Sequence, residues 1–147
     1  MTQSIYVNLP VSDVERSVAF YASLGATRDP RFSVPGTAAA MVFSEAITVM
    51  LLSHDHFRNF APRAIADAHA ANEVLICFSR ESRAAVDATV EQVVAAGGRA
   101  DLRAKQEMGG CMYGRNVEDL DGHVIELMWL DVAAMMRAGV AASTEVA

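Results

Sequence analysis

The chain has 147 residues, a formal net charge of −6 at pH 7, and a composition that is 52% hydrophobic and 20% charged. These values are typical of one globular domain with a buried core. The acidic balance and the lack of any Lys/Arg cluster argue against a nucleic-acid partner, and no apolar run approaches the length of a membrane span. Without a secretory signal, and with only two cysteines, the chain is expected to be cytoplasmic.

The first fifty residues predict one strand, one helix and three further strands. Apolar and polar residues alternate over 5–9, as in a half-buried strand. Ser12 and Glu15 form a capping-box pattern that predicts a helix start, and Gly25 is a natural stop. One face of the predicted helix carries Val14, Val18, Tyr21 and Leu24. The following strands are expected at about 26–33, 38–44 and 47–53.

The same order of elements is expected again in the second half of the chain. Residues 74–79 read as a strand, Ser82 as the next helix N-cap, and Gly97 as the end of that helix. The sequence DLDG at 119–122 supplies turn chemistry between the last two strands. These later strands are expected near 99–105, 110–118 and 123–130.

The two halves correspond at an offset that grows smoothly along the chain. The offset is 70, then 72, then 75 residues for the pairs Ser12 and Ser82, Gly25 and Gly97, and Leu52 and Leu127. An ordered drift of this kind indicates a duplicated unit. Because two copies must pack against each other, the cleft between them is a natural place for a ligand.

These boundaries predict a single domain over 1–138 that consists of two modules. The modules span about 4–53 and 73–131, and residues 54–72 join them. A structureless connection of that length is uncommon, so short helical turns are expected in its FRNF and IADAHA stretches. The remaining residues, 139–147, are small and polar and are expected to form a flexible tail.

Two motifs resemble those of a known superfamily. They are SD-x-x-x-S-x-x-FY at Ser12–Tyr21 and DGH-x-x-EL at Asp121–Leu127. Together with the doubled pattern over about 4–131, they resemble the vicinal oxygen chelate superfamily, which contains glyoxalase I, bleomycin-resistance proteins, fosfomycin-resistance enzymes and extradiol dioxygenases. The resemblance implies an α+β fold of two βαβββ modules that form an open, cup-shaped barrel.

The resemblance also implies where a metal ion would bind. In this superfamily a divalent metal usually lies in the cup, held by one residue from the first strand and one from the fourth strand of each module. Glu126 stands at the position of the family's glutamate ligand. Alternation along the last strand supports an inward orientation, because it directs Glu126 and Met128 away from the helix-packed face. A carboxylate among apolar residues is costly unless it is paired or metal-bound.

The other three ligand positions are less suitable. In the first module they correspond to Tyr6 and to Leu51, or to Met50 if the alignment slips by one residue. In the second module the remaining position is Glu73, with Val74 as the alternative. The sequence therefore predicts either no metal or one divalent ion, with Glu126 and Glu73 as candidate ligands. The His-Asp-His run at 54–56 offers further candidates.

Several polar residues are candidates for binding a ligand in the cup. Tyr6 and Asn8 share one face of the first strand, and Tyr113 and Arg115 share one face of a later strand. If Arg115 points inward, it can pair with Glu126 or bind an anionic group; if it points outward, it is surface charge. Leu51 and Met128 would add apolar walls.

Two functions remain open at this point, and whether the protein is an enzyme is open with them. The first is a binding protein, resembling the bleomycin-resistance branch, that holds a small molecule in the cup without the full family metal site. The alternative is a metal-dependent lyase or isomerase resembling glyoxalase I, with Glu126 as metal ligand and catalytic proton shuttle. The resemblance further implies a homodimer whose modules complete each other's cups.

Overall fold

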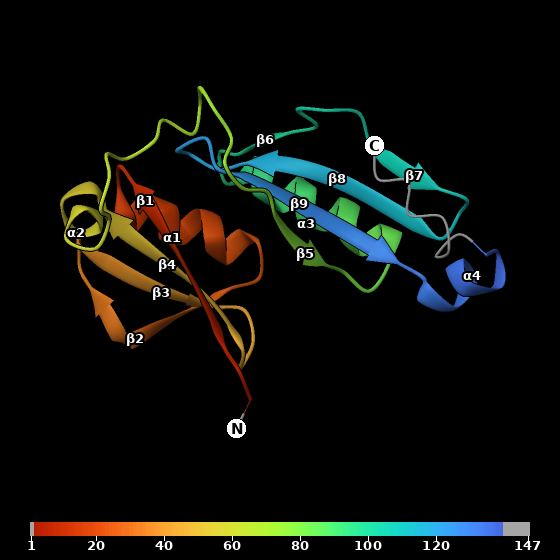
Figure 1. The fold of residues 1–147 in the computed structure, drawn as a ribbon, viewed down its shortest axis with the longest axis horizontal. Coiled ribbons are helices and arrows are strands. Elements are labelled where there is room, and N and C mark those ends of the chain that lie inside the picture. The colour runs from red at the N-terminus through yellow and green to blue at the C-terminus, as the bar shows by residue number, and fades with distance from the viewer. Residues whose placement is uncertain (1, 140–147) are drawn as a thin grey trace.

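A computed structural model describes residues 2–139 of the chain. Module one contains a four-stranded sheet, sheet A, in the order β1-β4-β3-β2, with β1 parallel to β4 and the other neighbours antiparallel (Figure 1). One helix follows the first strand. The elements are β1 (Ile5–Val11), α1 (Val14–Ser23), β2 (Thr27–Val34), β3 (Ala38–Val42) and β4 (Ile47–Ser53).

Module two repeats this arrangement in a second sheet, sheet B. Its strand order is β5-β9-β8-β6, and β7 also pairs with β8. A short helix, α2 (His54–Arg58), follows module one, and another, α4 (Val132–Arg137), follows module two. The elements of module two are β5 (Ile76–Ser79), α3 (Arg83–Ala95), β6 (Arg99–Ala100), β7 (Gln106–Met108), β8 (Met112–Glu118) and β9 (Val124–Leu130). The α+β fold with two βαβββ modules is confirmed.

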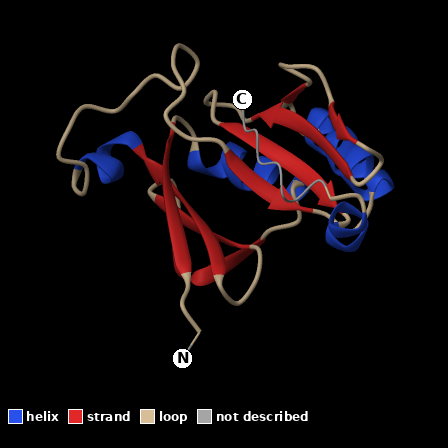
Figure 2. Ribbon diagram, turned by 45° about the vertical axis from the view of Figure 1, so that its right-hand side comes forward, coloured by secondary structure: helices blue, strands red, loops and turns tan. Residues whose placement is uncertain are grey.

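Each sheet has one face packed on helix and core and one face left open. Figures 1 and 2 show the two sheets as separate layers, with α1 beside sheet A and α3 beside sheet B. The inward-facing side chains of both modules form one continuous hydrophobic cluster. Its largest fully buried members include Phe20, Met41, Leu51, Ile125 and Leu127. This shared core fixes the strands whose other face is available for binding.

Side-chain contacts as well as the shared core join the modules. The rings of Phe43 and Phe78 stack with their centroids 4.3 Å apart. Arg80 donates hydrogen bonds to the carbonyl of Leu24, at 2.6 Å, and to the hydroxyl of Thr89, at 3.1 Å. Leu24 is the C-cap of α1, where a nearby cation also interacts favourably with the helix dipole.

The start of α1 differs from the capping box expected from the sequence. The N-cap is Asp13, whose carboxylate accepts a hydrogen bond from the backbone N–H of Arg16 at 3.1 Å. The amide of Ser12 instead donates to Asp121 of module two, and Glu15 forms an ion pair with Arg28. Asp is as good an N-cap as Ser, so tertiary contacts decide between two adjacent candidates.

Two further regions can be compared with the sequence expectations, and one of them needs correction. Residues 68–70 of the IADAHA stretch form a short turn, in which the amides of Ala70 and Ala71 both donate to the carbonyl of Asp67, in line with the short helical turn expected there. The strand expected at 99–105 is limited to β6, because Asp101 has a φ of +53° and turns the chain away from β8. Of the expected flexible tail, 139–147, all residues after Gly139 lie outside the described part of the chain. No helix within residues 2–139 is long and apolar enough to cross a membrane.

Candidate functional site

The open face of sheet B carries Glu126. The backbone of β9 places Glu126 between Cys77 of β5 and Asn116 of β8, and its neighbours Ile125 and Leu127 are fully buried on the opposite face. Among residues 2–139, none donates a hydrogen bond to the Glu126 carboxylate or forms an ion pair with it. Its side chain is half-buried. The predicted orientation of Glu126, away from the helix, agrees with this burial pattern.

Met128 and Cys77 lie on this same open face. Met128 is half-buried and pairs with Gly114 of β8. Burial raises the pKa of the Cys77 thiol, and the negative charge of Glu126 raises it further. Because the thiolate is the nucleophilic form, this environment does not activate Cys77 as a nucleophile.

The strand registers show which positions correspond in the two modules. Asn8 pairs with Met50 in module one, and Cys77 pairs with Glu126 in module two. Asn8 and Cys77 each lie five residues before the N-cap of their module's helix. Met50 is therefore the counterpart of Glu126. Two residues further back, the corresponding positions are Tyr6 in β1 and Leu75, which lies just before the start of β5.

This register corrects two sequence assignments. Leu51 is not the counterpart of Glu126: it is fully buried beside Leu9 in the core, while Met50 lies on the open face. The first-strand position in module two is Leu75 rather than Glu73. A shift of one residue along a strand exchanges the two faces, and the alternation of apolar residues in the sequence ITVMLL is too weak to fix it.

The four corresponding positions do not fit the family's metal site. They hold a phenol, a thioether, an aliphatic side chain and one carboxylate, at Tyr6, Met50, Leu75 and Glu126. Divalent ions of this type bind carboxylates and imidazoles, whereas a thioether suits softer metals and a leucine offers no donor. Within the described residues, no three His, Cys, Asp or Glu side chains lie close enough to hold a metal ion.

Tyr113 and Arg115 lie on the opposite face of sheet B from Glu126. The Tyr113 hydroxyl donates to Asp87 of α3 at 2.7 Å, and the Arg115 guanidinium donates to the same carboxylate at 2.8 Å and to Asp101 at 2.6 Å. Arg115 therefore pairs with these two aspartates and not with Glu126. Neither residue lines the open face as the sequence interpretation allowed, because β8 presents them to α3.

The pKa shifts of Asp87, Asp101 and Arg115 agree with a structural role for these ion pairs. Hydrogen bonds from Tyr113 and then Arg115 hold the pKa of Asp87 below its ordinary value. The hydrogen bond from Arg115 likewise lowers the pKa of Asp101, and the two carboxylates raise that of Arg115. Sequence reasoning missed both aspartates, because nothing in their spacing links them to β8.

The open face of sheet A contains a hollow of about 540 Å³. Tyr6, Asn8 and Met50 line it, as do Phe32 and Thr48, and every lining residue belongs to module one. The rings of Tyr6 and Phe32 are 65% and 66% exposed, so each presents an apolar surface to a ligand. Arg31 also lies at this hollow, but its charge is paired with Asp29 through two hydrogen bonds.

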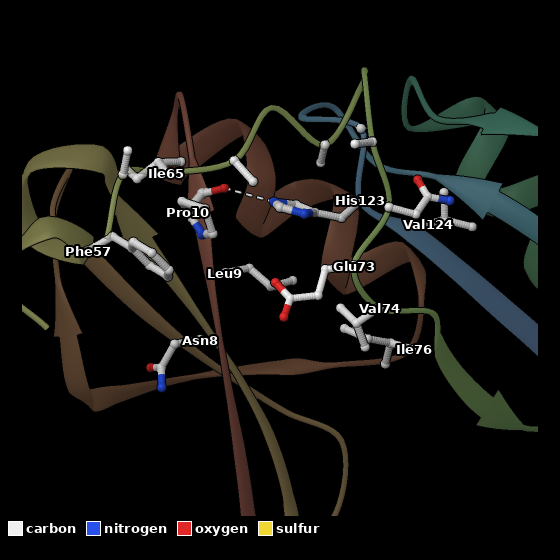
Figure 3. A pocket seen from close by; sticks show the side chains of 16 residues that line it. Asn8, Leu9, Pro10, Phe57, Ile65, Glu73, Val74, Ile76, His123 and Val124 are labelled. Carbon is white, nitrogen blue, oxygen red and sulfur yellow. Dashed lines mark hydrogen bonds between the residues drawn. The ribbon is translucent and has the colours of Figure 1, made fainter. Parts of the chain in front are cut away.

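A second cavity, of about 230 Å³, lies between the two modules (Figure 3). Asn8, Leu9 and Pro10 of β1 form one wall, and Glu73 lies on the module-two side. Glu126 is not among the described residues that line this cavity. His123 bridges the modules by donating a hydrogen bond from Nε2 to the carbonyl of Pro10 at 2.8 Å.

The remaining histidines are dispersed. His54 and His56 lie in α2, where the ring of His56 packs edge-on against Phe60. His69 bonds through Nδ1 to Glu118 at 3.2 Å. The predicted His-Asp-His run therefore does not converge with Glu126 or Glu73 on one site within the described residues.

Two βαβββ modules, each with one covered and one open sheet face, are the arrangement expected for the vicinal oxygen chelate fold. The Glyoxalase/Bleomycin resistance protein/Dioxygenase superfamily matches residues 4–127, and the chain belongs to that superfamily.

Solved structures agree with this assignment. A hypothetical protein, SA1046 from Staphylococcus aureus, is 30% identical, with 88% of this chain and 94% of that chain covered and a TM-score of 0.71. A lactoylglutathione lyase from Agrobacterium tumefaciens is 17% identical, with coverages of 87% and 93% and a TM-score of 0.62. The fosfomycin resistance protein FosX from Mesorhizobium loti is 15% identical, with coverages of 92% and 99% and a TM-score of 0.64. Among functionally curated proteins, none matches this chain significantly.

Proposed function

We propose that this protein binds a small, partly apolar organic molecule in a cup and does so without the superfamily's four-ligand metal site. The observation that supports this most directly is the strand register, which makes Met50 the counterpart of Glu126 and, extended to the residue before β5, makes Leu75 the counterpart of Tyr6. Three side chains of this kind provide contact surface rather than metal coordination.

The hollow on sheet A supports the chemical class of the ligand. The exposed rings of Tyr6 and Phe32 favour a flat, apolar body, because aromatic faces stack well on such surfaces. The Asn8 amide and the Thr48 hydroxyl would supply a small number of oriented hydrogen bonds. Ser44 and Glu45 also line the hollow, which therefore combines apolar surface with polar groups that can orient a ligand. Since Asp29 already pairs with Arg31, the hollow favours an uncharged ligand over an anion.

We further propose that a second copy of the chain completes the cup. All lining residues of the hollow come from module one, so one wall is missing within a single chain. The module-two face carries Leu75, which is 52% exposed, and the carboxylate of Glu126, which has no partner among residues 2–139. In a two-fold dimer, the module-one face of each chain would oppose the module-two face of its partner.

A complementation experiment tests both proposals. Met50→Arg places a charge in the module-one face, and Leu75→Arg does the same in the module-two face. Each variant alone should lose binding of the neutral fluorescent probe N-phenyl-1-naphthylamine. If two chains share each cup, refolding the variants together should restore about one quarter of the wild-type sites, because half of the dimers are mixed and each has one intact cup.

The outcomes separate the two parts of the proposal. Restored binding supports the shared cup, and no restoration with a monomeric mass by light scattering would contradict the dimer. Probe binding that survives both single substitutions would contradict the cup itself. Arg137→Ala on the exposed end of α4 is the matched control, and its probe binding should equal that of the wild type.

The second candidate is a metal-dependent lyase or isomerase in which Glu126 contributes to metal binding. The observation in its favour is that Glu126 stands at the family's glutamate position with no partner among residues 2–139. Because the other three corresponding residues do not fit a metal, we derive no reaction step from this candidate. Metal analysis of protein purified without an affinity tag tests it. Less than about a tenth of an equivalent, and no gain on adding nickel, zinc, manganese or iron, would rule it out.

A further inference from the structure

The cavity between the modules is separate from the hollow on sheet A. We call it the seam cavity, and its lining shares only Asn8 with that hollow. Its volume of about 230 Å³ is well above the roughly 30 Å³ that one water molecule occupies in the liquid. The cavity therefore has room for a small organic molecule, independently of any ligand in the cup.

The walls of the seam cavity are mainly hydrocarbon. Leu9 and Pro10 face it from module one, Val74 and Ile76 from module two, and Phe57 from α2 (Figure 3). Water alone is a poor occupant of such a space because it has few polar partners there. These walls favour a ligand with an aliphatic or aromatic body.

Residues 64–73, which we call the strap, cover the seam cavity. Four of the strap residues that line the cavity are alanines, at 64, 66, 68 and 71, so short side chains leave the space open. The strap is held in place on module two. Its backbone at Ala68 and His69 packs so closely on Gly122 that a Cβ there would lie 2.6 Å from the His69 nitrogen. His69 also bonds to the buried carboxylate of Glu118.

The lining contains one carboxylate, that of the exposed residue Glu73, which has no partner within residues 2–139 and can contact a ligand. Figure 3 shows the Glu73 carboxylate directed toward Leu9, across the cavity. No residue in the described part of the chain, 2–139, forms a hydrogen bond or ion pair with this carboxylate. By contrast, the Nε2 of His123 is already engaged with Pro10. The lining therefore combines apolar walls with a single negatively charged acceptor.

We propose that the seam cavity is a second binding site, specific for a small molecule with an apolar body and a protonated amine that pairs with Glu73. An ammonium group supplies both the positive charge and the N–H donors that an ionised carboxylate accepts. Its alkyl or aryl part fills the space between β1 and the module-two wall beneath the alanines of the strap.

Three probes of matched size test the proposal: pentylammonium, 1-pentanol and pentanoate. Binding is followed by amide chemical shifts in two-dimensional NMR, at Val74, Ile76 and Val124. Pentylammonium should bind about two- to fivefold tighter than 1-pentanol, since a partly screened charge pair contributes about 0.4–1 kcal/mol, in the upper part of the range for such pairs. Pentanoate should bind most weakly.

Single substitutions test whether the preference for pentylammonium arises in the seam cavity. Glu73→Gln keeps the shape and should reduce pentylammonium binding to the level of 1-pentanol. Glu91→Gln removes the same charge from the exposed face of α3 and should change nothing. Ala71→Phe should block all three probes by filling the space, and Ala64→Leu serves as a milder filling variant if Ala71→Phe does not fold.

Two results would overturn the proposal. One is equal affinity for the three probes in the wild type. The other is pentylammonium binding that persists in folded Ala71→Phe or Ala64→Leu protein, because the amine would then bind elsewhere. Shifts confined to residues of the sheet A hollow would likewise contradict the seam site, while leaving the proposed cup function intact.

Discussion

The hydroxyl of Tyr21 in module one donates a 2.7 Å hydrogen bond to the carboxylate of Asp119 in module two, and both groups are buried. The same carboxylate accepts hydrogen bonds from the amides of Asp121 and His123 at 2.9 and 2.8 Å. Burial raises the pKa of Asp119 and also that of Tyr21. This relationship connects α1 to the turn before β9, and so positions the strand that carries Glu126.

Tyr21→Phe should destabilise the protein by about 1–3 kcal/mol, because it leaves one buried oxygen of Asp119 without its donor. Tyr113→Phe is the matched control. Its hydroxyl bonds to Asp87, whose side chain is 45% exposed, so water can replace the lost donor and the cost should be at most about 1 kcal/mol. Urea unfolding at pH 7 measures both free energies. Equal losses would contradict the proposed difference in burial.

Gly122→Ala should destabilise the fold and loosen the strap. Gly122 has a φ of +91°, and an added Cβ would lie 2.6 to 2.8 Å from the backbone of Ala68 and His69. Gly36→Ala measures the cost of a side chain at positive φ alone, because Gly36 has a φ of +71° and no atom lies near the added Cβ. We expect about 1 kcal/mol for Gly36→Ala and a clearly larger loss for Gly122→Ala.

Hydrogen exchange distinguishes a local from a global effect of Gly122→Ala. Amides of the strap, such as those of Ala70 and Ala71, should exchange faster than in Gly36→Ala protein of comparable stability. Unchanged exchange in the strap would mean that Gly122 does not hold it.

Arg115→Met should lower stability at neutral pH, and the deficit should shrink in acid. The pKa values of Asp87 and Asp101 lie below their ordinary value of about 3.9. Their pairing therefore stabilises the fold above that pH, and the contribution is lost as pH falls through the lowered pKa values. Urea midpoints measured from pH 7 to pH 2 for both proteins show whether the curves converge.

The control for this pH effect is Arg58→Met. Arg58 pairs with Asp55, but the two side chains are 59% and 97% exposed, so the pair should contribute little at any pH. A difference between wild type and Arg115→Met that stays constant from pH 7 to pH 2 would show that packing, and not the ion pairs, accounts for the loss.

Glu126→Gln should increase the reactivity of Cys77. The charge of Glu126 contributes to the raised pKa of the thiol, so its removal lowers that pKa and increases the thiolate fraction. The rate of alkylation by iodoacetamide at pH 8 measures this change, and buried Cys111 is an internal control that should stay unreactive. An unchanged rate at Cys77 would place Glu126 too far away to affect it.

Much of the fold could be predicted from sequence, because its signals are local. Alternation over 5–9 predicts β1, and Ser82 is the N-cap of α3 as expected. Gly25, with a φ of +103°, follows the end of α1, as the sequence suggested. Each of these depends on the conformational preferences of a few neighbouring residues.

The candidate site was less predictable, because it depends on register and on which face of a strand is covered. The sequence ITVMLL does not show whether Met50 or Leu51 faces the core. The pairing of Asn8 with Met50 decides that question. Likewise, Arg115 could pair with Glu126 or with groups near α3, and only the position of Asp87 selects the second.

By itself, the sequence determined the duplicated βαβββ plan, its superfamily and the presence of a single carboxylate, Glu126, at a conspicuous position. The tertiary structure decided that Met50 is the counterpart of Glu126 and Leu75 that of Tyr6, that Arg115 lies on the other face, and that Glu73 faces a cavity between the modules. The physical reason is the range of the forces involved. Helix caps and strand alternation act between near neighbours, whereas strand pairing and module packing join residues about 40 to 100 positions apart.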